Sequence, residues 1–148
     1  MKQASNGARV VLSAMLVLAF QQVAYADDQD VIEFRQLIMK QLDSGSAALG
    51  MLAAGQIPPD TLALQAKALA YNAKAAGKAF EAKVRGGDSK PEVWSKWADF
   101  SKRMETFAKK SEEMAKVAET GNVAKVTELL VDALPCKQCH DVYRRTKK

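Results

Sequence analysis

The chain has 148 residues, of which 48% are hydrophobic, 26% charged and 7% aromatic, and its formal net charge is +5. This length suits one domain with a substantial core and excludes two ordinary domains. Two cysteines and one histidine exclude a disulfide-dense scaffold, a zinc-protease helix pair and a di-iron carboxylate bundle.

The first 26 residues predict a signal peptide. Lys2 and Arg9 are their only charges, and the apolar run Val10–Phe20 has the length of a signal-peptide core. The sequence Ala-Tyr-Ala ending at Ala26 fits cleavage after that residue, which predicts a mature domain of residues 27–148. Cleavage removes two positive charges and lowers the formal charge from +5 to +3. A retained membrane anchor is the alternative, although the run is short for a membrane span.

The mature region predicts helices and no convincing strand, because helical periodicity runs throughout and strict alternation is absent. Asp27 or Asp28 is expected to cap a first helix that runs to about Ala53. Its apolar positions form two neighbouring stripes, Val31, Phe34, Ile38 and Leu42 in one and Ile32, Met39, Leu42 and Leu49 in the other. After two prolines, Asp60 is expected to cap a second helix. Its predicted buried face consists mostly of small residues: Leu62, Ala66, Leu69, Ala73, Ala76 and Phe80.

The third helix is predicted to start from a cap at Ser89, with Pro91 in its first turn, and to end at Gly121. It carries the strongest apolar stripe of the chain: Val93, Trp97, Phe100, Met104, Phe107, Ser111 and Met114. Asn122 is expected to cap a fourth helix that kinks or restarts at Pro135. Short connections favour antiparallel neighbours, so the sequence predicts an all-α, up-down-up-down four-helix bundle.

The sequence Cys136-Lys-Gln-Cys139-His140 is the C-x-x-C-H pattern of covalent haem attachment. Helical residues three or four positions apart share a face, so both sulfurs can reach the two vinyl groups of one porphyrin. His140 then offers its imidazole to the iron as the proximal ligand. Three alternatives remain. A thioredoxin-like redox pair lacks its βαβ context, and half a zinc site lacks a second ligand pair. A simple disulfide would make the chain an exported helical interaction protein without haem.

The C-terminal stretch CKQCHDVYR, residues 136–144, resembles the class II c-type cytochromes, the cytochrome c′ family. Two further stretches agree with that family: Phe34-Arg35 followed by Met39, and GGDSKPEVW at residues 86–94. The resemblance covers essentially all of the mature chain. It implies a four-helix bundle enclosing one covalently attached haem c near one end. Together with the signal peptide it implies a periplasmic protein, and it also implies a homodimer through the first two helices.

The resemblance implies roles for further residues around the haem. Arg144 is expected over the proximal side, where it shapes ligand access to the iron or pairs with a haem propionate. Arg35 interrupts an apolar stripe and needs an anion if it is buried, which a propionate would supply. Trp94 is expected in the wall of the haem site. The alternatives are a solvated Arg144, an Arg35 that reaches solvent, and core packing alone for Trp94 and for Tyr143.

Met39 separates two functions, because the resemblance places it on the distal side of the iron. If its sulfur ligates the iron, the haem is six-coordinate and the protein is an electron carrier. If it only packs over the iron, a five-coordinate haem binds NO or CO; a core residue unrelated to iron is the third reading. We expect single-electron transfer as the main function and gas binding as the alternative. The expected partners are a redox protein or a diatomic gas. We expect no binding to nucleic acid and, after cleavage of the signal peptide, no attachment to a membrane. No pattern indicates an enzyme.

Overall fold

The structure is a computed structural model that describes residues 27–134 and 136–146. The predicted signal peptide with its cleavage site, and Pro135, lie outside the described residues. The elements in chain order are α1 (Asp28–Ala53), the 3-10 helix η1 (Pro59–Thr61), α2 (Leu62–Ala79), α3 (Glu92–Ser95), α4 (Trp97–Ala118), α5 (Val123–Ala133) and α6 (Cys136–Tyr143). The described residues contain no strand beyond an isolated antiparallel bridge between Ser89 and Arg144. No helix in this part of the chain is long and apolar enough to cross a membrane.

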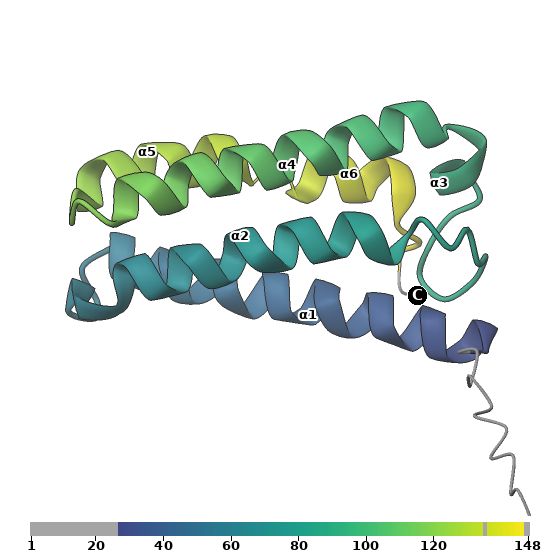
Figure 1. The fold of residues 1–148 in the computed structure, drawn as a ribbon, viewed down its shortest axis with the longest axis horizontal. Coiled ribbons are helices and arrows are strands. Elements are labelled where there is room, and N and C mark those ends of the chain that lie inside the picture. The colour runs from purple at the N-terminus through teal and green to yellow at the C-terminus, as the bar shows by residue number, and fades with distance from the viewer. Residues whose placement is uncertain (1–26, 135, 147–148) are drawn as a thin grey trace, which may run out of the picture.

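The predicted four-helix bundle is confirmed. α1 packs on α2, α2 on α4, α4 on α5, and α5 returns to α1 (Figure 1). The four long helices run alternately in opposite directions, and α6 follows α5 as a short separate helix on the same side of the bundle. The core between them is mostly aliphatic, with Leu49, Leu69 and Met114 among its fully buried side chains.

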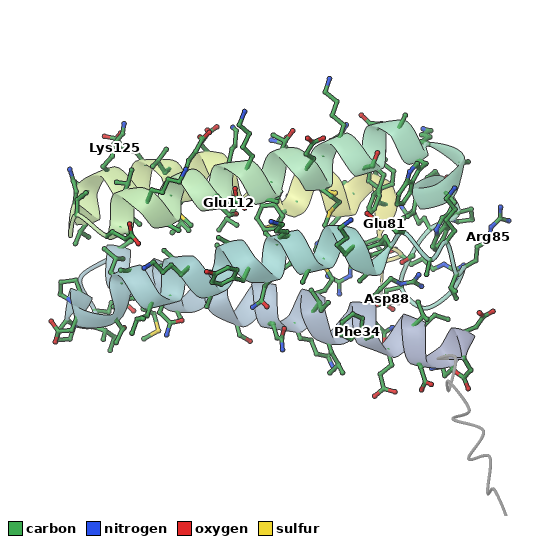
Figure 2. All side chains as sticks on the ribbon, in the orientation of Figure 1. Phe34, Glu81, Arg85, Asp88, Glu112 and Lys125 are labelled. Carbon is green, nitrogen blue, oxygen red and sulfur yellow. The ribbon has the colours of Figure 1, made fainter. Side chains whose placement is uncertain are left out.

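The first helix is capped as predicted but faces the core differently. Asp27 Oδ1 accepts a hydrogen bond from Asp30 N at 2.8 Å, and Asp30 Oδ2 accepts one from Asp27 N, which forms a capping box. The prediction of Phe34 in the inward stripe is wrong, because its side chain is 55% exposed on the outside of α1 (Figure 2). Consecutive helical residues point about 100° apart, so the rotation of α1 that directs Arg35 inward turns Phe34 away from the core. It buries Arg35.

The second helix has the predicted buried face, since all six residues named for it are buried. Ala66, Ala73 and Ala76 are fully enclosed within the chain, so they form intrachain contacts and leave no surface for a second copy. The predicted cap is wrong: Asp60 belongs to η1, and Thr61, the residue at the N-cap position, makes no side-chain capping bond.

The predicted third helix is divided at Lys96, whose φ of −116° and ψ of 40° leave the helical region. This break lets α3 depart from the axis of α4 and contact α6. The predicted Ser89 cap is wrong as well, because Pro91 occupies the N-cap position and Ser89 pairs with Arg144 instead.

The fourth helix restarts near the haem-attachment motif, as expected. Asn122 Oδ1 caps α5 by accepting a hydrogen bond from Lys125 N at 3.0 Å. α5 ends at Ala133, and α6 begins at Cys136. Leu134 has φ −107° and ψ 65°, which agrees with the rule that a residue before proline avoids the helical region. The cysteines therefore lie on a helix of their own.

Candidate functional site

A cavity of about 470 Å³ lies between α1, α4, α6 and the loop of residues 86–89. Its volume is within the roughly 300–1,000 Å³ that cofactor and ligand sites occupy. Six predicted site residues from both ends of the mature chain line it: Arg35, Met39, Cys136, Cys139, His140 and Arg144. Trp94 does not line it, so the structure gives no support to its predicted place in the wall.

The two cysteines and the histidine come from α6. Both thiols are free, and burial raises the pKa of each above its ordinary value. His140 is partly buried, and its pKa is lowered first by that burial and then by the charge of Arg144. The neutral imidazole, which is the form that binds metals, is therefore favoured at neutral pH.

The alternatives to haem find little support in the described residues. They hold no group of three or more histidine, cysteine or acidic side chains arranged to bind a bare metal ion. They also lack the strands that surround a thioredoxin-like cysteine pair.

Arg35 is a buried cation, only 3% exposed, so the alternative of a side chain reaching solvent is wrong. Its Nη1 donates a hydrogen bond to Val84 O at 2.6 Å. The guanidinium carbon lies 5.1 Å from the centroid of the Phe80 ring and 5.5 Å from that of Trp94. Its Nη2 is buried without a hydrogen-bond partner, and no described carboxylate forms an ion pair with it. Burial lowers the pKa of this group, yet a guanidinium stays charged in proteins, so the site lacks an anion here.

Met39 lines the cavity and Trp94 does not. Met39 is half-buried on α1, about one turn after Arg35, and lines the cavity. In Figure 1, α1 runs below α6. Trp94 packs against the guanidinium of Arg35, and its own buried Nε1 has no hydrogen-bond partner among the described residues. Trp94 therefore holds Arg35 in place and makes no contact with the cavity.

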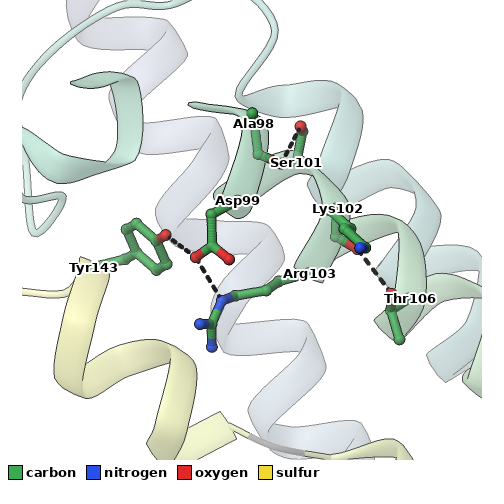
Figure 3. Close-up of polar contacts among 7 residues, drawn as sticks. All are labelled: Ala98, Asp99, Ser101, Lys102, Arg103, Thr106 and Tyr143. Atoms are coloured by element: carbon green, nitrogen blue, oxygen red, sulfur yellow. Dashed lines mark hydrogen bonds and ion pairs between the residues drawn. The ribbon is translucent and has the colours of Figure 1, made fainter. Parts of the chain in front are cut away.

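Tyr143 fixes α6 to α4 through contacts that the sequence did not predict. It is buried, its hydroxyl donates a hydrogen bond to Asp99, and Arg103 Nε pairs with the same carboxylate at 2.7 Å (Figure 3). The Tyr143 ring meets Phe100 edge-on, with centroids 5.1 Å apart. Burial and then the hydrogen bond to Asp99 raise the pKa of Tyr143 to about 12, while the same bond lowers the pKa of Asp99. The spacing of Asp99 and Arg103, an i,i+4 pair, was the only sequence signal for this network.

The loop of residues 86–90 holds the C-terminal end of α6. Lys90 N and Lys90 Nζ donate hydrogen bonds to Tyr143 O at 2.9 Å and Asp141 O at 2.8 Å. Gly86 and Gly87 have φ of 131° and 63°, and a Cβ on either would lie 2.7 Å from a carbon of Ile32. Glycine is therefore required where this loop passes α1. Arg144, about half exposed, approaches Asp88 to 4.0 Å at the rim of the cavity.

Comparison with known proteins identifies the group to which this bundle belongs. A sequence model of the family described as Cytochrome C' matches residues 30–144. The chain belongs to the cytochrome c′ family. A cytochrome c′ from Alcaligenes xylosoxydans xylosoxydans is 28% identical over 126 residues, which cover 83% of this chain and 99% of the relative.

Solved structures of cytochrome c prime from Alcaligenes xylosoxidans share the fold. A nitric oxide complex of a mutant has a TM-score of 0.76 at 26% identity, covering 82% of this chain and 99% of that chain. A ferrous variant with bound NO also has a TM-score of 0.76 at 26% identity, covering 83% and 99%.

Members of the cytochrome c′ family are haem-binding proteins that carry one covalently attached haem c. The donor set of the cavity fits that group. Two free thiols stand next to an imidazole on α6, and the buried Arg35 Nη2 lacks an acceptor that a haem propionate carboxylate would provide.

Proposed function

We propose that Cys136 and Cys139 hold the haem c through two thioether bonds and that His140 is the proximal iron ligand. All three side chains line one cavity from the same short helix, which supports this assignment. Burial favours the neutral imidazole that iron binds. Arg35 pairs with a haem propionate through Nη2, and Arg144 at the rim governs access to the proximal side.

We propose further that the distal side, next to Met39, binds a diatomic gas such as NO or CO. The observation that carries this proposal is that relatives of the same fold were solved with NO bound. A haem with one protein ligand keeps an open position at which a diatomic gas coordinates iron. On α1, the apolar side chains Ile32, Met39 and Leu42 line the cavity beside polar and charged ones: Arg35, Gln36, Lys40, Asp43 and Ser46.

Electron transfer with Met39 as the sixth ligand is the second candidate. It is favoured by the position of Met39, which lines the same cavity as His140 from a different helix. An axial thioether would occupy the gas site and raise the reduction potential. Met39 thus decides between the two functions, because the same cavity serves both.

The deciding experiment is the ferrous absorption spectrum with and without CO, for wild type, Met39→Ala and the control Met51→Ala. Met51 lies on the same helix but is exposed and does not line the cavity. Gas binding predicts a high-spin wild type that binds CO readily, with Met39→Ala changing the affinity and Met51→Ala leaving it unchanged. A low-spin wild type that resists CO, together with a high-spin Met39→Ala that binds it, would establish the electron carrier instead.

Export and assembly belong to the same proposal. We propose cleavage after Ala26 and maturation in the periplasm, so the protein should have the mass of residues 27–148 plus one haem. That haem should resist acidified organic extraction, and a bare polypeptide mass from a host that matures c-type cytochromes would contradict the attachment. A homodimer through α1 and α2 would cover Phe34, Leu37, Leu64 and Tyr71, which are exposed in the monomer. Sedimentation showing only monomer at tens of micromolar, about the concentration that reveals weak contacts, would exclude it.

A further inference from the structure

A second hollow, here called the α4–α5 groove, lies on the outer surface where α4 passes α5 and the start of α6. Its volume is about 570 Å³. Arg103, Phe107 and Leu134 line both this groove and the cavity next to the cysteines. The groove therefore shares a wall of side chains with the haem site, and anything seated in it lies close to that site.

Basic side chains dominate the groove. Lys102, Arg103, Lys110 and Lys137 line it, against two acidic residues, Asp99 and Asp132. Both acids are already paired, Asp99 with Arg103 and Asp132 with Lys110, each at 2.7 Å. Lys102 forms no ion pair with any residue that the structure describes, whereas Lys137, whose side chain is 86% exposed, pairs with Asp141 at 2.6 Å. Figure 3 shows Lys102 and Arg103 one residue apart along this part of α4. Lys102 is thus the groove cation without an ion-pair partner among the described residues, and the groove lining holds two more basic than acidic side chains.

An exposed apolar residue also lines the groove. Val131 lines the groove and is 80% exposed, more than any other large hydrophobic side chain in the described residues. An apolar centre surrounded by polar side chains is the usual anatomy of a protein interface. Complementary charge around such a centre steers a partner toward it and fixes its orientation.

We propose that the α4–α5 groove is the docking surface for an acidic, carboxylate-bearing patch of a redox protein. This proposal rests on the haem attachment proposed above. One electron passes from the reduced centre of the partner, which becomes oxidised, to ferric iron, which becomes ferrous; no bond is made or broken and no proton moves. Gas binding to ferrous haem requires such a supply of electrons, and Arg103, Phe107 and Leu134 line both the groove and the cavity that would hold the haem.

Two charge-reversal variants of the holoprotein test the location of docking. The groove variant is Lys102→Glu with Lys137→Glu, and the control is Lys109→Glu with Lys125→Glu. Each pair of substitutions changes the net charge by the same amount, and each replaces one lysine of α4. In each pair the other lysine makes a local ion pair, Lys137 with Asp141 and Lys125 with Glu128. Neither control residue lines the groove. Lys→Gln versions of both pairs replace any charge-reversal variant that fails to fold.

The kinetic measurement is the oxidation of the ferrous protein by anionic ferricyanide at low salt. We expect the groove variant to react at least about tenfold more slowly than the control, with the difference lost at high salt. A cationic cobalt(III) tris-phenanthroline oxidant should not be slowed. A short polyglutamate peptide should inhibit ferricyanide oxidation of wild type but not of the groove variant. Equal rates in the two variants would overturn the proposal.

Binding is measured independently of electron transfer with hexacyanocobaltate(III), an anion that does not exchange electrons under these conditions. It should shift the backbone amide resonances of Val131 and Gln138 in wild type and leave them unmoved in the groove variant. Binding of this anion without competition by polyglutamate would mark a small-anion site and refute protein docking. The absence of the reduced-haem α-band from the wild-type absorption spectrum would refute the haem attachment. This outcome is distinct from a failure of the docking proposal.

Discussion

The buried hydroxyl of Ser111 yields a quantitative prediction about the core that holds the haem site in place. Ser111 lies on the inward face of α4, one turn before Met114 and Ala115, and is fully buried. Its Oγ has no hydrogen-bond partner in the described residues. A buried polar group without a partner costs about 1–3 kcal/mol, because it loses water and gains nothing in return. Ser111→Ala removes that group and leaves nearly the same shape.

We expect Ser111→Ala to raise the free energy of unfolding by about 1–2 kcal/mol, including a few tenths from the better helix propensity of alanine. For a domain of this size the melting temperature should then rise by about 4–8 °C. Urea denaturation followed by circular dichroism measures the change, and the slope of the transition should stay the same.

Ser101→Ala on the same helix is the matched control, since Ser101 Oγ already donates a hydrogen bond to Ala98 O and is less buried (Figure 3). It should change stability by no more than about 0.5 kcal/mol. If Ser111→Ala is destabilising, or no different from Ser101→Ala, the Ser111 hydroxyl has a partner and the reasoning fails.

Three further predictions concern the surroundings of the haem site. Gly86→Ala should lower the free energy of unfolding by about 1–3 kcal/mol, because the φ of 131° at this position disfavours a side chain. Gly50→Ala, in open space on α1, should raise the free energy of unfolding, and urea denaturation measures the sign of both changes. Tyr143 has a raised pKa of about 12, so its contribution to stability is complete below pH 10 and is lost as the pH rises toward 12. Denaturation across this range should show that loss in wild type and in the exposed control Tyr71→Phe but not in Tyr143→Phe. Arg35→Met should destabilise the haem-loaded protein by about 3–5 kcal/mol, and Arg35→Lys by less, because the first leaves a buried propionate without its cation; equal melting curves for wild type and both variants would contradict this pairing.

Local patterns in the sequence determined much of the helical structure of this protein. The face of α2 from Leu62 to Phe80 is buried as its spacing predicted, and the caps at Asp27 and Asn122 form as expected. The restart of the helix at Cys136 also followed from a single proline. These features depend on residues within one or two turns of each other, so helical geometry alone specifies them. The C-x-x-C-H motif has the same local character, and it indicated haem before any fold was known.

Tertiary packing decided what local patterns left open. Phe34 and Arg35 are neighbours, and the sequence assigned each of them to an apolar stripe of the first helix. The structure buries Arg35, because Val84, Phe80 and Trp94 contact its guanidinium. The predicted caps at Asp60 and Ser89 failed because the chain entering each helix takes another path.

The attachment of α6 was equally hidden from the sequence. Tyr143 bonds Asp99 across 44 residues, and Lys90 bonds Asp141 across 51. Helical periodicity carries no information about which distant residues meet. Only the packed bundle specifies those contacts, and they position His140 and both cysteines beside the cavity.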